Sequence, residues 1–231
     1  MPPQKANINK FVTPCFMLFV AATRSGKTHF IKYLLRSMLK SRKFDWGIII
    51  SPSAYKGNEC SWHGYVPDKY LFNEVMTKDE ITSLIGSVIT KQIEFTENDS
   101  PKKMFIVLDD IFGTYRMDLP IFTKLATSGR QYGITTFFVA HKFATELPML
   151  LREQASYIFV FRNMVTDINC RLFYNMYLST SFTDWQSLKR FMMTNTENYG
   201  VVCICPGATN QKTAIYCMRA PATMKKFELT F

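Results

Sequence analysis

Eight residues near the amino terminus have the types and spacing of a phosphate-binding loop: Ala21, Ala22, Thr23, Arg24, Ser25, Gly26, Lys27 and Thr28. In such a loop the backbone N–H groups surround phosphate oxygens, the lysine reaches the β- and γ-phosphates, and the last hydroxyl binds Mg²⁺. The segment follows an apolar run and precedes a helical pattern, which is the context that the motif requires. We therefore expect all eight residues to bind a nucleoside triphosphate, with Lys27 as a catalytic cation and Thr28 as a magnesium ligand.

The loop departs from the usual pattern at its first position, where Ala21 stands in place of glycine. Alanine adds only a Cβ to the turn, so it is the least intrusive replacement. The alternative is a chance sequence from Ser25 to Thr28 at the start of an ordinary helix. The apolar run before the loop and the helical pattern after it argue against that alternative.

Two acidic residues, Asp109 and Asp110, directly follow the apolar run Met104–Leu108. An acid after a buried strand lies at the carboxyl edge of a parallel sheet, where open α/β sheets bind their ligands. We expect Asp109 to hold Mg²⁺ through water, and Asp110 to orient the water that attacks the γ-phosphate. For Asp110 the alternative is a solvated loop acid, because glutamate is commoner in this role.

Apolar runs of strand length alternate with helical patterns along the chain. Nearly continuous hydrophobic runs are typical of parallel strands that are buried on both faces. The predicted strands are Cys15–Val20, Trp46–Ile50, Met104–Leu108, Ile134–Ala140 and Tyr157–Phe161, and the predicted helices are Lys27–Leu39 and Asp79–Ile93. This alternation predicts an α/β fold with a mostly parallel, helix-covered central sheet.

Two stretches depart from the alternation. Residues 52–70 contain Gly, Pro, Asn and Ser and predict a long exposed loop. Near the end, Tyr199–Cys205 and Ala214–Arg219 flank a turn sequence and predict a C-terminal β-hairpin. A length of 231 residues suits one domain over 1–231, with a core at about 12–165 and a helical segment and hairpin at about 166–231.

The composition is that of a folded, basic chain. Hydrophobic residues make up 47%, and 28 Lys and Arg against 18 Asp and Glu give a net charge of +10. This excess attracts polyanions such as DNA, although an ordinary basic surface is the alternative. The apolar run Cys15–Ala22 is much shorter than the roughly 20 residues of a membrane-spanning helix, and no secretory signal is recognised at the start. We therefore expect an intracellular protein without a membrane span.

None of the six cysteines has the C-x-x-C spacing of a zinc ribbon, so we expect reduced thiols in the core. The alternative is a metal site built from Cys203, Cys205, Cys217 and His63. Alternate residues on a strand point the same way and leave the closure of a tetrahedral site to chance, which argues against it.

Four segments, in this order, resemble the FtsK/HerA superfamily of P-loop ATPases: AATRSGKT, MFIVLDD, SGRQYGITTFFVAH and LPMLLREQASYIFVF. They are most similar to the genome-packaging ATPases of poxviruses, other nucleocytoplasmic large DNA viruses and virophages. The resemblance covers about Cys15 to Phe161. It implies a RecA-like fold of the ASCE class of P-loop NTPases, with ATP as the substrate and Mg²⁺ as the cofactor. No N-K-x-D segment occurs, so nothing favours guanine recognition.

The resemblance also implies two further catalytic residues. Arg130 would reach the γ-phosphate of a neighbouring subunit as an arginine finger, with Arg152 as the rival and a surface salt bridge as the alternative for either. His141 stands where the family usually has a sensor glutamine, and it would contact the γ-phosphate or the attacking water. A strand-end histidine whose hydrogen bonds the backbone satisfies is the alternative.

The function implied by the resemblance is an ATP-driven translocase that packages double-stranded viral DNA into a preformed capsid without reading its sequence. Its expected partners are DNA, a capsid or portal-vertex protein, and further copies of the chain in a homo-oligomeric ring. It would act in the host cytoplasm or virus factory, or with the virion. The aromatic loop Tyr55–Tyr70, which contains Trp62, His63 and Tyr65, would contact DNA or a capsid protein, and an ordered surface cover over the sheet is the equal alternative.

Three other functions stay open at this point. A cellular or plasmid DNA-pumping ATPase would belong to the same superfamily. A nucleoside-phosphate kinase would transfer phosphate to a nucleotide without stimulation by DNA. A non-hydrolysing binding module would use the loop only as a nucleotide-dependent scaffold, and the presence of Asp109 and Asp110 counts against it.

Overall fold

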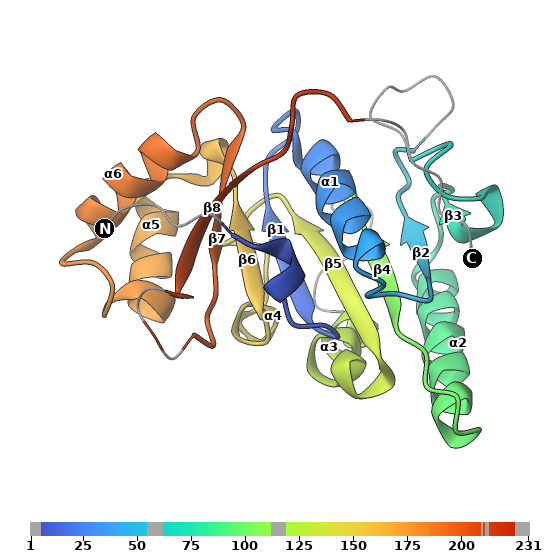
Figure 1. Cartoon of the computed structure of the whole chain (residues 1–231). Helices are drawn as coiled ribbons and strands as arrows, with labels where there is room; N and C mark the ends of the chain where they lie inside the picture. The colour runs from blue at the N-terminus through green and yellow to red at the C-terminus, as the bar shows by residue number, and fades with distance from the viewer. Residues whose placement is uncertain (1–5, 55–61, 112–118, 209, 211–212, 225–231) are drawn as a thin grey trace.

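A computed structural model describes residues 6–54, 62–111, 119–208, 210 and 213–224. Its centre is an eight-stranded sheet with the order β3-β2-β4-β5-β1-β6-β7-β8 (Figure 1). The strands are β1 (Phe16–Val20), β2 (Trp46–Ile50), β3 (Leu71–Phe72), β4 (Met104–Leu108), β5 (Ile134–Ala140), β6 (Tyr157–Val160), β7 (Gly200–Ile204) and β8 (Ile215–Arg219). In this spatial order, each pair of neighbouring strands from β3 through β2, β4, β5 and β1 to β6 is parallel, whereas β7 is antiparallel to both β6 and β8. The predicted α/β fold with a C-terminal hairpin is confirmed.

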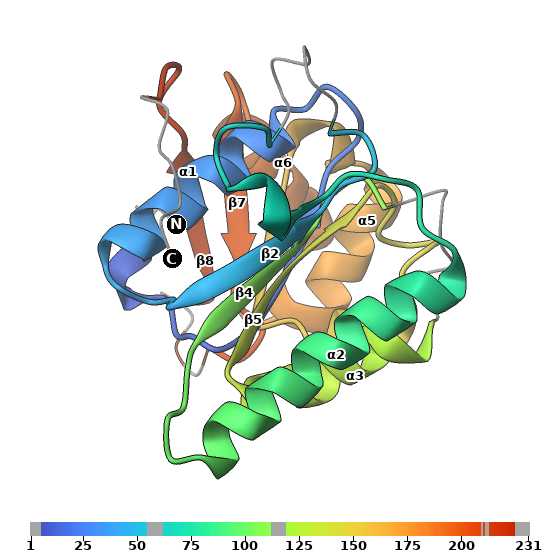
Figure 2. The same cartoon turned by 90° about the vertical axis from the view of Figure 1, so that its right-hand side faces the viewer.

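Helices cover both faces of the sheet. They are α1 (Lys27–Lys40), α2 (Lys78–Glu97), α3 (Pro120–Ser128), α4 (Met149–Glu153), α5 (Asp167–Phe173) and α6 (Trp185–Asn195). Buried side chains of α1 form one core cluster with one face of the sheet, and those of α2 to α6 form another with the opposite face. Figure 2 shows this arrangement, with α1 on one side of the sheet and α2 and α3 on the other.

The strands were recognisable in the sequence because both of their faces are buried. Along β1, Phe16 and Leu18 pack in the cluster with α2 to α6, whereas Met17 and Phe19 pack in the cluster with α1. Alternate side chains of a strand point to opposite faces, so a strand between two helical layers is apolar at every position. The predicted bounds of β2, β4 and β5 agree with the structure, and the other predicted elements differ by a few residues at their ends.

The prediction of a long exposed loop over residues 52–70 is wrong for several described residues. Ala54, Trp62 and Val66 are buried in the cluster that contains α1. The apolar area of a tryptophan favours its burial beneath the loop, and this burial outweighs the polar composition of the segment. Residues 55–61 lie outside the described part of the chain. Of the roles considered for Trp62, His63 and Tyr65, the structure favours covering the sheet.

The cysteines do not form the alternative metal site. Cys203 and Cys205 pack on the α1 side of the sheet, whereas Cys217, which is on β8, packs against the other core cluster. Within the described residues, no group of three or more histidine, cysteine, aspartate or glutamate side chains has the geometry to hold a metal. Cys15, Cys170, Cys203, Cys205 and Cys217 are free thiols, and Cys60 is outside the described residues.

The segment between β6 and β7 is helical, as expected. The side chain of Thr166 caps α5, and a capping box between Asp184 and Ser187 begins α6.

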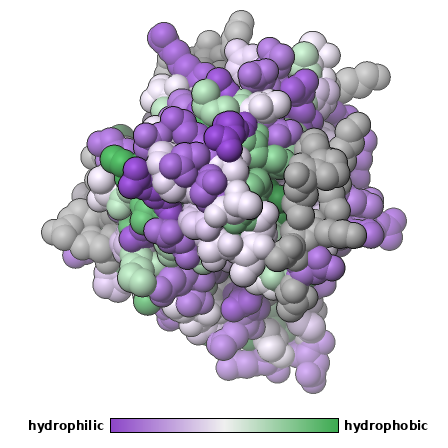
Figure 3. Space-filling model, turned by 90° about the vertical axis from the view of Figure 1, so that its left-hand side faces the viewer, coloured by the Kyte–Doolittle hydropathy of each residue, from purple (hydrophilic) through white to green (hydrophobic). Residues whose placement is uncertain are grey.

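The surface at the α5 and α6 end of the molecule is mostly hydrophilic, with scattered hydrophobic spots (Figure 3). The residues of α5 and α6 share their core cluster with the sheet. The division of the chain into a core and a C-terminal segment at about residue 165 stays a prediction. No helix in the described ranges is both long enough and apolar enough to cross a membrane.

Candidate active site

The predicted site residues of the loop and the acidic pair meet at the carboxyl edge of the sheet. The loop follows β1, Asp109 and Asp110 follow β4, and His141 follows β5. These three strands are parallel and neighbours in the order β4-β5-β1, so their ends lie at one edge. The topology therefore brings together residues such as Thr28 and Asp109, which are 81 positions apart in the chain.

Ala21 takes the first loop position without strain. Its backbone N–H donates to the carbonyl of Ala140 over 3.0 Å, which continues the pairing of β1 with β5. Its side chain is fully buried in the α1 cluster. The Cβ that replaces the usual glycine therefore packs into the core, and this explains why the departure is tolerated.

The loop then turns sharply into α1. Arg24 and Gly26 have positive φ angles of 61° and 82°, and Gly26 is the N-cap of α1 with no side-chain capping bond. The first backbone N–H groups of a helix have no partner within the helix, and with the helix dipole they attract anions. Thr23 and Arg24 are exposed at this turn, and Ala22 and Ser25 are half-buried. This turn can therefore accept an anion such as a phosphate at the start of α1.

Lys27, Thr28 and the two aspartates are in direct contact. The Thr28 hydroxyl donates to Oδ2 of Asp109 over 2.9 Å. The Lys27 ammonium forms an ion pair with Asp110 and lies 3.5 Å from Oδ1 of Asp109. Lys27 and Asp109 are both buried, and buried charges must be paired or hydrogen-bonded to persist. The cation and the carboxylates that the sequence placed in one site therefore compensate each other.

Two buried polar atoms at this edge have no hydrogen-bond partner among the described residues: Oγ of Ser25 and Oδ1 of Asp109. Buried polar atoms are nearly always hydrogen-bonded, so such atoms call for an explanation. One belongs to the loop and the other to the acid expected near Mg²⁺. The hydroxyl of Thr28 and the carboxylate of Asp109 are hard oxygen donors, which magnesium prefers. The residues present therefore fit a magnesium–phosphate group.

Asp110 is held in its ionised form by its surroundings. Partial burial raises its pKa, but the neighbouring His141, the charge of Lys27 and the hydrogen bond from Ser53 outweigh burial and keep the pKa well below its usual range. The hydroxyl of Ser53 donates to Oδ2 of Asp110 over 2.6 Å. Asp110 also has a positive φ of 54°, which is uncommon for a residue with a side chain and recurs at functional sites.

Sequence reasoning missed several residues that support the site. The indole N–H of Trp62 donates to Oδ2 of Asp109 over 3.1 Å, and the side-chain oxygen of Asn163 accepts from the N–H of Ala22 over 3.4 Å. Ser53 contacts Asp110, as described above. Ser53 and Trp62 lie in a segment that resembled an exposed loop, and no motif marks any of the three.

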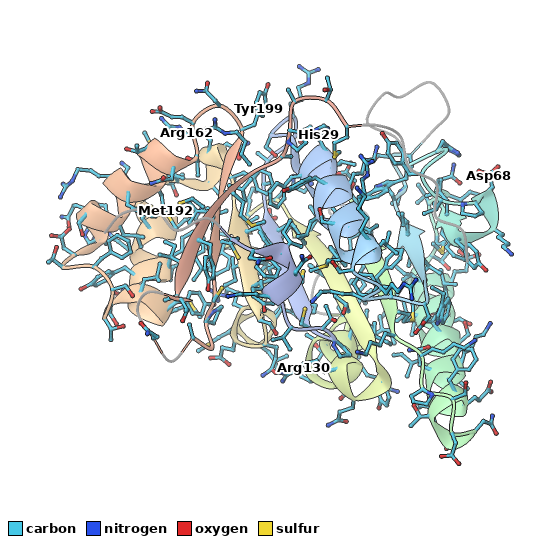
Figure 4. All side chains as sticks on the ribbon, in the orientation of Figure 1. His29, Asp68, Arg130, Arg162, Met192 and Tyr199 are labelled. Atoms are coloured by element: carbon cyan, nitrogen blue, oxygen red, sulfur yellow. The ribbon has the colours of Figure 1, made fainter. Side chains whose placement is uncertain are left out.

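A cavity of about 310 Å³ lies beside the loop. Its lining includes Gly26, His29, Phe161, Tyr199 and Pro221. A Cβ built on Gly26 would lie 3.2 Å from Cδ1 of Tyr199, so this ring closely approaches the loop. Figure 4 shows His29 and Tyr199 at the same end of the molecule, at the carboxyl edge. The largely aromatic and aliphatic lining can accommodate a flat apolar ring.

The structure does not bring either arginine to the site within one chain. Arg130 directly precedes β5, so it lies near the amino edge of the sheet, and Arg152 is on α4, the helix that precedes β6. Arg130 is exposed at that end, away from His29 and Tyr199 (Figure 4). The guanidinium of Arg152 lies over the ring of Phe143 at 5.6 Å. A role for either arginine in a neighbouring subunit's site stays a prediction.

Comparisons with known proteins agree with this architecture. The chain matches the family described as "Poxvirus A32 protein" over residues 5–223. The genome packaging NTPase B204 from Sulfolobus turreted icosahedral virus 2, in complex with sulfate, superposes with a TM-score of 0.60 at 13% identity and covers 93% of this chain and 98% of that chain. The same protein in complex with ATP-gammaS superposes with a TM-score of 0.55 at 12% identity, over 90% of this chain and 98% of that one.

A cellular protein shares the fold as well. The cytoplasmic domain of the Thermomonospora curvata Type VII secretion ATPase EccC superposes with a TM-score of 0.59 at 12% identity, over 89% of this chain and 25% of that chain. No curated protein matches the chain. At these identities the solved structures establish the fold, whereas the family match spans nearly the whole sequence. The chain therefore belongs to the poxvirus A32 protein family, and it is an ATPase with the P-loop fold.

Proposed function

We propose that this ATPase is a motor that moves double-stranded DNA into a preformed viral capsid. The observation that carries the proposal is the contact of Thr28 with Asp109 and of Lys27 with Asp110, because it joins the phosphate loop to the acidic strand end. Membership of the poxvirus A32 family and the fold shared with a viral genome packaging NTPase support packaging as the use of that site.

ATP would bind along the carboxyl edge. Its phosphates would lie in the loop of residues 21–28, where backbone N–H groups and Lys27 are available. Its base would lie in the adjacent cavity, between His29, Phe161 and Tyr199. The similar B204 NTPase is described in complex with ATP-gammaS, an ATP analogue, which supports ATP as the nucleotide.

The donor set next to the loop would hold magnesium. Thr28 would bind it directly through its hydroxyl oxygen, and Asp109 would bind it through water. When bound, Mg²⁺ supplies positive charge to the β- and γ-phosphate oxygens. A hydroxyl that gives its lone pair to a metal still has a proton, so the bond from Thr28 to Asp109 can persist in the loaded site.

The remaining groups would act on the attacking water and the γ-phosphate. Asp110 is ionised and can accept a hydrogen bond from water, and His141 stands beside it to contact the γ-phosphate. Lys27 would leave Asp110 for the phosphate, which exchanges one anionic partner for another. Phosphoryl transfer depends mainly on positioning and charge stabilisation, and these residues provide both.

The coupling to DNA would come from assembly. A ring of copies, each with a net charge of +10, would surround the duplex with a basic channel that contacts phosphates without reading bases. In such a ring, Arg130 or Arg152 would complete the site of the neighbouring subunit. A capsid or portal-vertex protein would anchor the ring, in the host cytoplasm or virus factory where capsids are filled.

ATP hydrolysis by the purified protein, with and without long duplex DNA, tests this proposal. We expect DNA to stimulate turnover, and Lys27→Ala to abolish it while the protein stays folded. Transfer of phosphate to a nucleoside monophosphate at a rate indifferent to DNA would instead establish a kinase.

Mixing Arg130→Ala protein with Lys27→Ala protein tests whether two subunits share a site. Hybrid rings should recover part of the ATPase activity, and no recovery at any ratio would refute a role for Arg130 in trans.

A further inference from the structure

Trp62 is a buried tryptophan whose polar atom contacts the expected magnesium site. Its exposed fraction is 1%, and its indole N–H donates to Oδ2 of Asp109 over 3.1 Å. A buried indole N–H usually has a partner, but the partner is rarely an ionised carboxylate in a catalytic site. Neither the phosphate-binding motif nor the proposed chemistry accounts for this contact.

The contact distinguishes the two oxygens of Asp109. Oδ2 accepts two hydrogen bonds, from Thr28 over 2.9 Å and from Trp62 over 3.1 Å. Oδ1 is buried without a hydrogen-bond partner among the described residues and lies 3.5 Å from the Lys27 ammonium. A carboxylate rotates about its last bond and exchanges its oxygens unless donors hold it. Two donors on one oxygen hold the other oxygen toward the phosphate side of the site.

The indole is itself held in place by α1 and by its own segment. The Lys32 ammonium of α1 lies 5.3 Å from the ring centre of Trp62 and 3.9 Å from that of Tyr65. The N–H of Tyr65 donates to the carbonyl of Trp62 over 3.0 Å. Lys32 has an exposed fraction of only 3%, and cation–π attraction is stronger when water is excluded. These contacts with Lys32 and Tyr65 restrain the ring that carries the donor N–H.

We propose that Trp62 is a positioning residue for Asp109, which keeps Oδ1 available for metal-bound water, and that its indole reports occupation of the site by magnesium and nucleotide. The inference rests on the proposed Mg²⁺–ATP site. The indole N–H of Trp62 can donate to a carboxylate but cannot bind a cation. Trp62 would therefore act on the metal only through Asp109.

Trp62→Phe tests the positioning role because it removes the N–H and keeps an aromatic ring in the core. A hydrogen bond to a charged group contributes enough for us to expect that the Mg²⁺ concentration for half-maximal binding of ATP-gammaS rises about 10-fold. Binding of the same analogue in EDTA should not change. Trp46→Phe is the matched control, because the Trp46 indole donates to Gln92 over 3.1 Å at the start of β2, at the opposite edge. A Mg²⁺ dependence in Trp62→Phe equal to that of Trp46→Phe would refute the proposal.

A second experiment keeps Trp62 and does not depend on the folding of that variant. In Trp46→Phe, Trp185→Phe protein, Trp62 is the remaining tryptophan, since the chain has 3. We expect its emission to change when Mg²⁺ is added with ATP-gammaS, but not when the analogue is added in EDTA. Unchanged emission while a filter assay shows Mg²⁺-dependent binding would overturn the reporter role. If wild-type protein binds no nucleotide by that assay, the proposed function fails instead.

Discussion

Nε2 of His141 lies 3.6 Å from Oδ1 of Asp110, across the ends of the neighbouring strands β4 and β5. The same carboxylate oxygen forms the ion pair with Lys27. One oxygen atom is thus shared by the cation of the phosphate loop and by the residue in the sensor position. When Lys27 turns to a phosphate, His141 beside Oδ1 and Ser53 on Oδ2 can keep Asp110 oriented.

This arrangement predicts unequal effects of two substitutions at position 141. His141→Ala should lower kcat about 100-fold with a small change in KM, which is the cost of removing one oriented group from a charge-stabilising site. His141→Gln should retain most of the activity, because an amide can donate to the same oxygen. Steady-state ATP hydrolysis measures both. Full activity in His141→Ala would show that the histidine is only a structural strand-end residue.

Alanine substitutions at Gly26 and at Gly86 should have opposite effects on stability. Gly26 has a φ of 82°, and an added Cβ would lie 3.2 Å from the Tyr199 ring, so Gly26→Ala should lower the free energy of unfolding by about 1–2 kcal/mol. Gly86 lies within α2, and apart from the backbone of its own helix no described atom lies within 4 Å of an added Cβ, so Gly86→Ala should raise this free energy by about 0.5–1 kcal/mol. Urea denaturation at matched protein concentration measures both, and the same sign for the two would contradict the argument.

The central sheet could be predicted from the sequence because its signals are local. Strands between two helical layers are continuous apolar runs, and the phosphate loop and acidic pair directly follow two of them. β3 escaped prediction because its two residues are too short for any periodicity. The start of α2 was misplaced by one residue, although Thr77 and Glu80 form a capping box that marks it.

The supporting residues of the site could not be predicted in the same way. Trp62 and Asp109 are 47 positions apart, and no spacing rule relates them. The segment around Trp62 contains turn-forming residues, so its composition favoured an exposed loop over a buried one. Arg130 was predicted by resemblance. It lies just before β5, whereas the phosphate loop follows β1, and these two strands are parallel neighbours. Arg130 and the loop of one chain are therefore at opposite edges of the sheet.

Tyr199 provides a test of where the nucleotide base lies. It borders the cavity beside the loop, so Tyr199→Ala should raise the KM for ATP about 10-fold, as expected for the loss of stacking on a base, and leave kcat nearly unchanged. Tyr199→Phe retains the ring and should behave as the wild type. Equal KM values for Tyr199→Ala and wild type would place the base elsewhere.

The buried thiol of Cys15 gives a prediction that depends on pH. Burial raises the pKa of the Cys15 thiol to about 12, although the charges of Lys43 and Arg130 act in the opposite direction. At pH 8 only about one thiol in ten thousand is then ionised, and the thiolate is the reactive form, so alkylation of the folded protein should be slow at this site.

The same shift makes stability depend on pH. The Cys15 thiol of the unfolded chain loses its proton near pH 9, whereas that of the folded chain keeps it until about pH 12. The contribution of Cys15 to stability is therefore complete below pH 9 and falls as the pH rises toward 12. Peptide mapping after iodoacetamide treatment, with and without urea, measures the protection, and rapid labelling of Cys15 in the folded protein at pH 8 would contradict its burial.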